Sequence, residues 1–168
     1  MTRGFISIGS NVEREQHISA GLKSLEQTFG KLVLSSVYES EPVGFSGNAF
    51  YNLVAGFDSG LDAKTIARLL RQLEFAHGRA TDSKKFSSRT LDLDLLLFGD
   101  GVVNEGGLQI PRADIERYAF VLEPLAEIAP DLKHPVLQLS YAQLWANMPK
   151  DGIRQCRVNF PPQQPAPK

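Results

Sequence analysis

Residues 90–98 read TLDLDLLLF, an apolar run of leucines that two aspartates interrupt. The alternation of leucine with aspartate predicts a β-strand, and the turn sequence GDG at 99–101 closes it. Residues two apart on a strand project from the same face, roughly 6.5 to 7 Å apart. Asp92 and Asp94 therefore share one face of this strand. We expect Leu96 and Phe98 to continue that face, and the opposite face to carry Leu91, Leu93, Leu95 and Leu97.

The segments before this run predict the rest of the fold. Asp62 is expected to cap a helix that ends at Gly78, because apolar residues recur between them at helical spacing. Apolar periodicity and turn residues also predict a helix over 18–29 and strands at 4–8, 31–40 and 50–59.

The resulting order is β-α-β-β-α-β, which is typical of the ferredoxin-like α+β sandwich, an antiparallel sheet with helices packed on one face. Residues 118–129 and 140–148 predict extra C-terminal helices. We expect one domain over residues 1–160 and a disordered tail, PPQQPAPK, at 161–168.

Composition narrows the class of protein. The chain has 168 residues and a formal net charge of −1, so no overall field favours nucleic acid or a membrane as partner. Its N-terminus is too short and too polar for a signal peptide, and no run approaches the roughly 20 apolar residues of a membrane helix. With Cys156 as its one cysteine and no marked interface, we expect a cytoplasmic monomer.

The aspartate pair has two interpretations. In the first, a half-buried strand turns its aspartates to water, which is common in antiparallel sheets. In the second, the carboxylates bind Mg²⁺ through oxygen ligands, with water and substrate phosphates in the remaining positions. The polar, basic loop that precedes the strand favours the second, because Arg79, Lys84, Lys85 and Arg89 would bind phosphate oxygens. Phe86 lies inside this loop and is a candidate to stack on a ligand ring.

The other motifs give less information about function. No GxxxxGK[ST] loop is present, so the chain is not a P-loop protein. The short IGSN sequence at 8–11 indicates a turn. His17, His77 and His134 lack the spacing of metal ligands and are expected to be structural or surface residues.

Several segments together resemble the 6-hydroxymethyl-7,8-dihydropterin pyrophosphokinase family, which transfers a diphosphate from ATP to a pterin alcohol. The most specific is RTLDLDLLLFGD at 89–100. The supporting segments, in chain order over roughly residues 4–148, are IGSN at 8–11, YESEPVG at 38–44, FYN at 50–52, LEFAHGR at 73–79 and AFVLEPLAEIAPDLKHP at 119–135.

The resemblance implies a residue set for the nucleotide and its metal. Asp92 and Asp94 would hold two Mg²⁺ ions that bridge the phosphates of the co-substrate ATP, and Asp94 would lie nearest the reacting hydroxyl. Arg79, Lys85 and Arg89 would bind the triphosphate, with Arg79, Arg89 and Asp94 as the catalytic residues. Glu74 and Arg112 complete the ATP-binding set.

The resemblance implies a second set for the pterin. The rings of Phe86 and Phe120 would sandwich it, and Asn52 would hydrogen-bond its edge. The same pocket would be lined by Ser40, Pro42 and Val43.

The chain departs from the family pattern at several positions. Arg112 stands where a histidine is usual, and Tyr118 where an arginine is usual. The other departures are Thr81 for an arginine, Ser88 for a proline and Glu41 for a proline. They leave two alternatives beside an active pyrophosphokinase: a divergent relative with another pterin substrate or weak turnover, and a non-catalytic domain that binds nucleotide or pterin.

Overall fold

The computed structural model describes residues 1–41, 49–78, 90–151, 153 and 155–160. Its centre is a sheet whose strands pair in the order β5-β1-β4-β3-β8, every neighbouring pair antiparallel. The βαββαβ core consists of β1 (Thr2–Ser10), α1 (Arg14–Phe29), β3 (Val37–Ser40), β4 (Phe50–Ser59), α2 (Ala63–Ala76) and β5 (Asp92–Phe98). The ferredoxin-like prediction is confirmed by this order.

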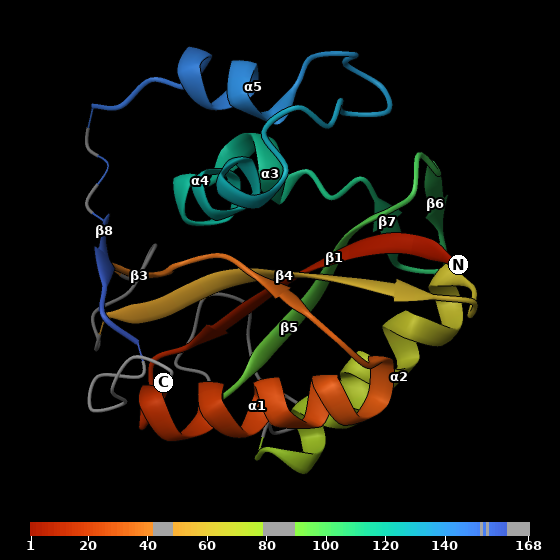
Figure 1. Ribbon diagram of the computed structural model, residues 1–168, viewed down its shortest axis with the longest axis vertical. Coiled ribbons are helices and arrows are strands. Elements are labelled where there is room, and N and C mark those ends of the chain that lie inside the picture. The colour runs from red at the N-terminus through yellow and green to blue at the C-terminus, as the bar shows by residue number, and fades with distance from the viewer. Residues whose placement is uncertain (42–48, 79–89, 152, 154, 161–168) are drawn as a thin grey trace.

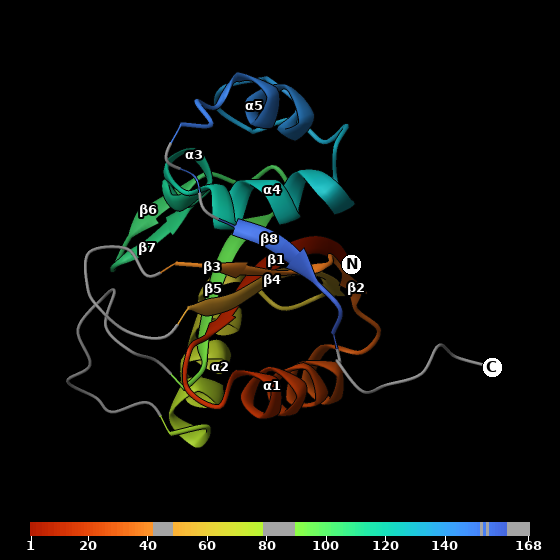
Figure 2. The same cartoon turned by 90° about the vertical axis from the view of Figure 1, so that its left-hand side faces the viewer.

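Helices cover both faces of the sheet. Helices α1 and α2 pack on one face, and the other is covered by α3 (Asp114–Arg117), α4 (Ala119–Ile128) and, outermost, α5 (Tyr141–Asn147) (Figures 1 and 2). The predicted extra helices therefore form a third layer. None of the helices within the described ranges is long and apolar enough to cross a bilayer.

Local signals explain the element boundaries. The Asp62 side chain accepts a hydrogen bond of 2.8 Å from the Thr65 N–H at the start of α2, as a capping aspartate should. Gly78, at a φ of 98°, follows the end of that helix, where its lack of a Cβ permits the left-handed conformation. Tyr118 is extended, with φ −122° and ψ 123°, and it separates α3 from α4.

Four short strands were not predicted as such. Residues 31–40 contain two strands, β2 (Val33–Leu34) and β3, instead of one. A separate hairpin consists of β6 (Val103–Glu105) and β7 (Leu108–Ile110), and β8 (Gln155–Val158) pairs with β3 at the edge of the main sheet. The turn predicted at 8–11 is wrong for Gly9 and Ser10, which continue β1 and pair with β4.

A β-bulge changes the predicted faces of β5. Phe5 pairs with Leu97 but its neighbour Ile6 pairs with Leu95, so Leu96 is an extra residue. Leu96 packs on the α4 side as predicted, but Leu97 joins it there and Phe98 packs on the α1 and α2 side. The prediction was therefore wrong for the last two positions, because alternation restarts after the extra residue.

Candidate active site

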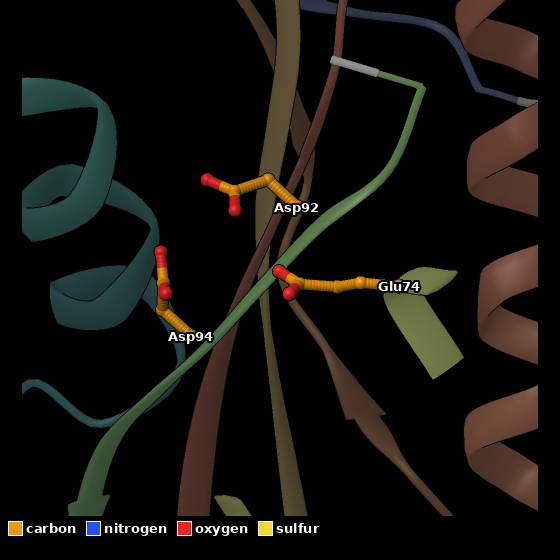
Figure 3. Close-up of side chains that lie close together, drawn as sticks. All are labelled: Glu74, Asp92 and Asp94. Carbon is orange, nitrogen blue, oxygen red and sulfur yellow. The ribbon is translucent and has the colours of Figure 1, made fainter. Parts of the chain in front are cut away.

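Three carboxylates converge at the free edge of β5. Asp92 and Asp94 are half-buried and project from the same face, toward α3 and α4, and Glu74 approaches from α2 (Figure 3). One oxygen from each lies within 4.8 Å of the other two. Oxygen ligands at this spacing suit a hard divalent cation such as Mg²⁺.

Glu74 is held in place by the strand itself. Its side chain is buried, and its Oε2 accepts a 2.7 Å hydrogen bond from the backbone N–H of Leu93. That N–H needs a partner because β5 is an edge strand whose other side pairs with β1. Sequence reasoning placed Glu74 near the nucleotide and not among the carboxylates. The available signal was the buried stripe of α2, in which Glu74 follows Ile66 and Leu70 at intervals of four residues.

Arg112 supplies positive charge beside this cluster. Its Nη1 lies 4.0 Å from Asp94 Oδ1 and its Nη2 lies 3.3 Å from Asp114 Oδ2. Its backbone N–H donates to the carbonyl of Leu96 over 3.1 Å, which attaches the segment after β7 to β5. Burial opposes the charge, but Asp94 and Asp114 outweigh it and raise the pKa of the Arg112 guanidinium. Arg112 is therefore a fixed cation at the carboxylates.

A cavity of about 280 Å³ adjoins Asp94 and Arg112. It lies between α2, β5 and the turn of the β6–β7 hairpin. Leucines form much of its wall, and two arginines of α2 contribute positive charge. These residues are Leu70, Leu93, Leu95, Leu108, Arg68 and Arg71. This combination of apolar wall and cationic groups suits a flat organic group attached to an anion.

The other half of the site lies across the sheet. Asn52 on β4 and Ser40 on β3 are both buried, and the Asn52 amide donates to Ser40 Oγ over 2.8 Å. Gly9 pairs with Asn52 on one side and with Asp92 on the other, so the three residues form one row across the sheet. Two strand spacings place the ends of this row about 10 Å apart.

Gly9 keeps the middle of that row open. A Cβ at this position would lie 2.8 Å from Asn52 Oδ1 and 3.7 Å from the carbonyl oxygen of Tyr51. Only glycine therefore leaves the Asn52 amide undisturbed. Without a side chain at this position, the surface of the sheet between Asn52 and Asp92 stays flat. Sequence reasoning assigned Gly9 to a turn and missed this role, for which a glycine inside a strand is the general signal.

Phe120 lies in the first turn of α4, on the layer that covers this face of the sheet. Its ring is partly exposed and stacks on that of Tyr118, with centroids 5.0 Å apart and planes 16° from parallel. The structure thus brings Glu74, Asp92, Asp94 and Arg112 together, and pairs Ser40 with Asn52. The predicted site residues Pro42, Val43, Arg79, Lys85, Phe86 and Arg89 lie outside the described residues.

Comparisons with known proteins identify the family of the chain. The family model described as 7,8-dihydro-6-hydroxymethylpterin-pyrophosphokinase (HPPK) matches residues 5–130. The chain is 34% identical over 157 residues to the 2-amino-4-hydroxy-6-hydroxymethyldihydropteridine pyrophosphokinase of Pseudomonas aeruginosa, covering 91% of this chain and 96% of that protein. The enzyme of the same name from Haemophilus influenzae is 34% identical over 143 residues, covering 83% and 89%.

Solved structures share the fold. A crystal structure of HPPK-DHPS in complex with substrates matches with a TM-score of 0.71 at 12% identity. The match covers 86% of this chain but 43% of that one, so the chain spans less than half of this fused relative. The family match over residues 5–130 and the relatives at 34% identity show that the chain belongs to the 7,8-dihydro-6-hydroxymethylpterin-pyrophosphokinase family.

Proposed function

We propose that this protein transfers a diphosphate group from ATP to the hydroxymethyl group of 6-hydroxymethyl-7,8-dihydropterin, releasing AMP, as a step of folate biosynthesis. Family membership over residues 5–130 and named pyrophosphokinase relatives at 34% identity support the assignment. ATP is the co-substrate, and the substrates are small molecules.

The observation that carries the proposal is the row from Asp92 through Gly9 to Asn52. An anionic co-substrate with its metal would bind at the carboxylate end, and a flat polar heterocycle would bind at the amide end. The separation of about 10 Å between those ends suits a pterin lying over Gly9 with its hydroxymethyl group toward Asp94. Holding two substrates in such an orientation is the main source of rate enhancement in phosphoryl-type transfer.

The proposed metal site consists of Asp92 and Asp94, and the Glu74 carboxylate lies beside them on α2. The donor set fits Mg²⁺, since it offers carboxylate oxygens within 4.8 Å of one another, and phosphate and water would supply the remaining ligands of an octahedral ion. Mg²⁺ bound there would neutralise phosphate charge that the carboxylates alone would repel. On the family resemblance we propose two ions.

The nucleotide part of the proposal places the adenosine of ATP in the cavity between α2 and the β6–β7 hairpin. Its leucine wall suits the base, and its position beside Asp94 and Arg112 lets the triphosphate extend to the carboxylates. Arg112 would bind phosphate oxygens at the point where the family usually has histidine. Arg79, Lys85 and Arg89 complete the phosphate contacts on the resemblance alone.

The pterin part of the proposal uses Asn52 and Ser40 as the polar edge contacts. Phe120 and Phe86 would stack on the two faces of the ring, and Pro42 and Val43 would line the same pocket. In the reaction, the hydroxymethyl oxygen forms a bond to the β-phosphorus, the bond from that phosphorus to the α–β bridging oxygen breaks, AMP leaves with that oxygen, and the hydroxyl proton is released. Asp94 would lie nearest that hydroxyl.

The proposal is tested by AMP release from ATP and Mg²⁺ with and without 6-hydroxymethyl-7,8-dihydropterin. We expect pterin-dependent AMP formation that is lost in an Asp92→Asn/Asp94→Asn variant. Asp100→Asn is the matched control, because Asp100 is exposed in the turn that follows the same strand. AMP formation that ignores the pterin, or that survives in the double variant, would contradict the proposal.

We also propose that the protein acts as a cytoplasmic monomer without a nucleic-acid partner. The near-neutral charge of −1 supports the last point. Light scattering after size-exclusion chromatography measures the oligomeric state, and a mass near twice 18.5 kDa would contradict a monomer.

A further inference from the structure

The side chain of Gln155 attaches the C-terminal strand β8 to the N-terminal half of α4. Gln155 Nε2 donates a 2.7 Å hydrogen bond to Glu123 Oε1 and a 3.1 Å hydrogen bond to the carbonyl oxygen of Ala119. Strand β8 lies beyond residues 5–130, the range of the family match, and beside α4 at the edge of the sheet (Figure 2).

A second attachment lies one helical turn further along α4. Arg157 Nε donates to the Tyr38 hydroxyl over 3.1 Å, and that hydroxyl donates to Glu127 Oε1 over 2.7 Å. Side chains two apart on a strand are separated by about 6.7 Å. Side chains four apart on a helix are separated by about 6 Å along the axis. The spacing of Gln155 and Arg157 therefore matches that of Glu123 and Glu127, and β8 holds α4 at two points in register.

On the proposed function, this attachment joins the two groups of residues that would contact the pterin. Gln155 pairs directly with Ser40, which accepts the hydrogen bond from Asn52. The carbonyl group that Gln155 binds belongs to Ala119, the residue before Phe120. The Gln155 amide thus connects β8, which pairs with the strand that carries Ser40, to the helical turn that carries Phe120.

We infer that Gln155 is a positioning residue for the pterin. It fixes the first turn of α4, and with it the Phe120 ring, relative to Ser40 and Asn52. This role rests on the proposed function, because it takes these residues as the pterin contacts. Gln155 acts through Phe120, so its loss should weaken pterin binding and leave nucleotide binding unchanged.

The test measures the dissociation constants of wild type and Gln155→Leu for 6-hydroxymethylpterin and, separately, for α,β-methylene-ATP with Mg²⁺. Leucine has similar size but no donor. We expect pterin affinity to fall roughly five- to twentyfold, because two hydrogen bonds are lost and one of them is to a carboxylate. Nucleotide affinity should stay within about twofold of wild type, since the proposed nucleotide cavity lies at β5, at the opposite edge of the sheet from β8. Cys156→Ser is the matched control, an exposed position on the same strand that should change neither constant.

Hydrogen exchange provides a readout that is independent of ligands. The amides of residues 121–123 should exchange faster in Gln155→Leu than in wild type, and those of α1 should not. Gln155→Glu, which opposes a carboxylate to Glu123, should exceed the effect of leucine on both measurements, with thermal unfolding showing that both variants are folded at the assay temperature. Unchanged pterin affinity in folded variants, or equal losses for pterin and nucleotide, would overturn the inference. Failure of wild type to bind the pterin would instead refute the proposed function.

Discussion

Replacing Gly9 by alanine places one methyl group between Asp92 and Asn52. The new Cβ would lie 2.8 Å from Asn52 Oδ1. Carbon and oxygen atoms in a favourable C–H···O contact stay about 3.3 Å or more apart. The Asn52 amide must therefore move by roughly half an ångström, and it is buried, with its Nδ2 donating to Ser40.

Two opposing terms set the effect of this change on stability. Overpacking of a buried site costs roughly 1–3 kcal/mol. Glycine to alanine alone stabilises a compatible position by about 0.4–1 kcal/mol through the unfolded state. We therefore expect a modest net loss in the free energy of unfolding. The larger effect should be on the pterin: loss of one aligned amide contact corresponds to a KM higher by roughly tenfold.

The assay is steady-state AMP formation with each substrate varied in turn, together with urea unfolding of the same samples. Gly56→Ala is the matched control, because Gly56 is a strand glycine on β4, the strand that carries Asn52, and its added Cβ would meet the Phe5 ring at 3.2 Å. That position is four residues from Asn52, about 13 Å along the strand. The control should change stability alone. If Gly9→Ala left the KM for the pterin unchanged, or raised that for ATP equally, the open floor would not be the pterin site.

Other changes test the remaining contacts. Arg112→Ala should lower kcat/KM by about 10- to 100-fold through loss of a charged phosphate contact, whereas Arg117→Ala, at an exposed position, should change it little. Steady-state AMP formation measures kcat/KM of both variants, and equal losses in the two would refute the role of Arg112. Glu127→Gln should lower the free energy of unfolding by about 1–3 kcal/mol in urea at pH 7, because the carboxylate accepts hydrogen bonds from the Tyr38 hydroxyl and from the Ser36 backbone N–H. Burial opposes ionisation of Glu127, but these hydrogen bonds outweigh it and lower its pKa. The contribution of Glu127 to the free energy of unfolding should therefore be present at neutral pH and be lost on acidification below about pH 4.5. The glutamine variant should not show this loss. Burial lowers the pKa of His134, so the unfolded state binds the proton first and the free energy of unfolding should fall as pH drops below about 6.5. Urea unfolding at several pH values should show a weaker pH dependence in His134→Gln. An unchanged slope of the free energy of unfolding against pH would contradict this prediction.

Periodicity in the sequence was sufficient for the core of the fold. The alternation at 90–98 and the helical spacing after Asp62 reflect burial on one side of an element, which the sequence records directly. The bulge at Leu96 depends on pairing with β1, which is remote in sequence, so the faces of Leu97 and Phe98 were predicted wrongly. Strand β8 is short and lies at an edge, where burial leaves little pattern.

The candidate site was predictable in part for the same reason. Asp92 and Asp94 are adjacent on one strand, so their common face followed from alternation alone. Glu74 reaches them only because α2 packs along the free edge of β5, where its carboxylate accepts from the Leu93 N–H. The gap at Gly9 likewise appears only when three strands are placed side by side.

Three residues that match the family pattern lie within the sheet, and two that depart from it lie outside the sheet. Asp92, Asp94 and Asn52 lie on strands, and on the proposed function the strand spacing of about 4.8 Å would set the separation of the two substrates. Arg112 and Tyr118 flank α3, outside the sheet. From there a long side chain reaches Asp94 without moving any strand, so charge can be supplied by arginine in place of histidine. Because transfer between two substrates depends most steeply on their alignment, substitutions outside the sheet should be tolerated better than any change in the row across it.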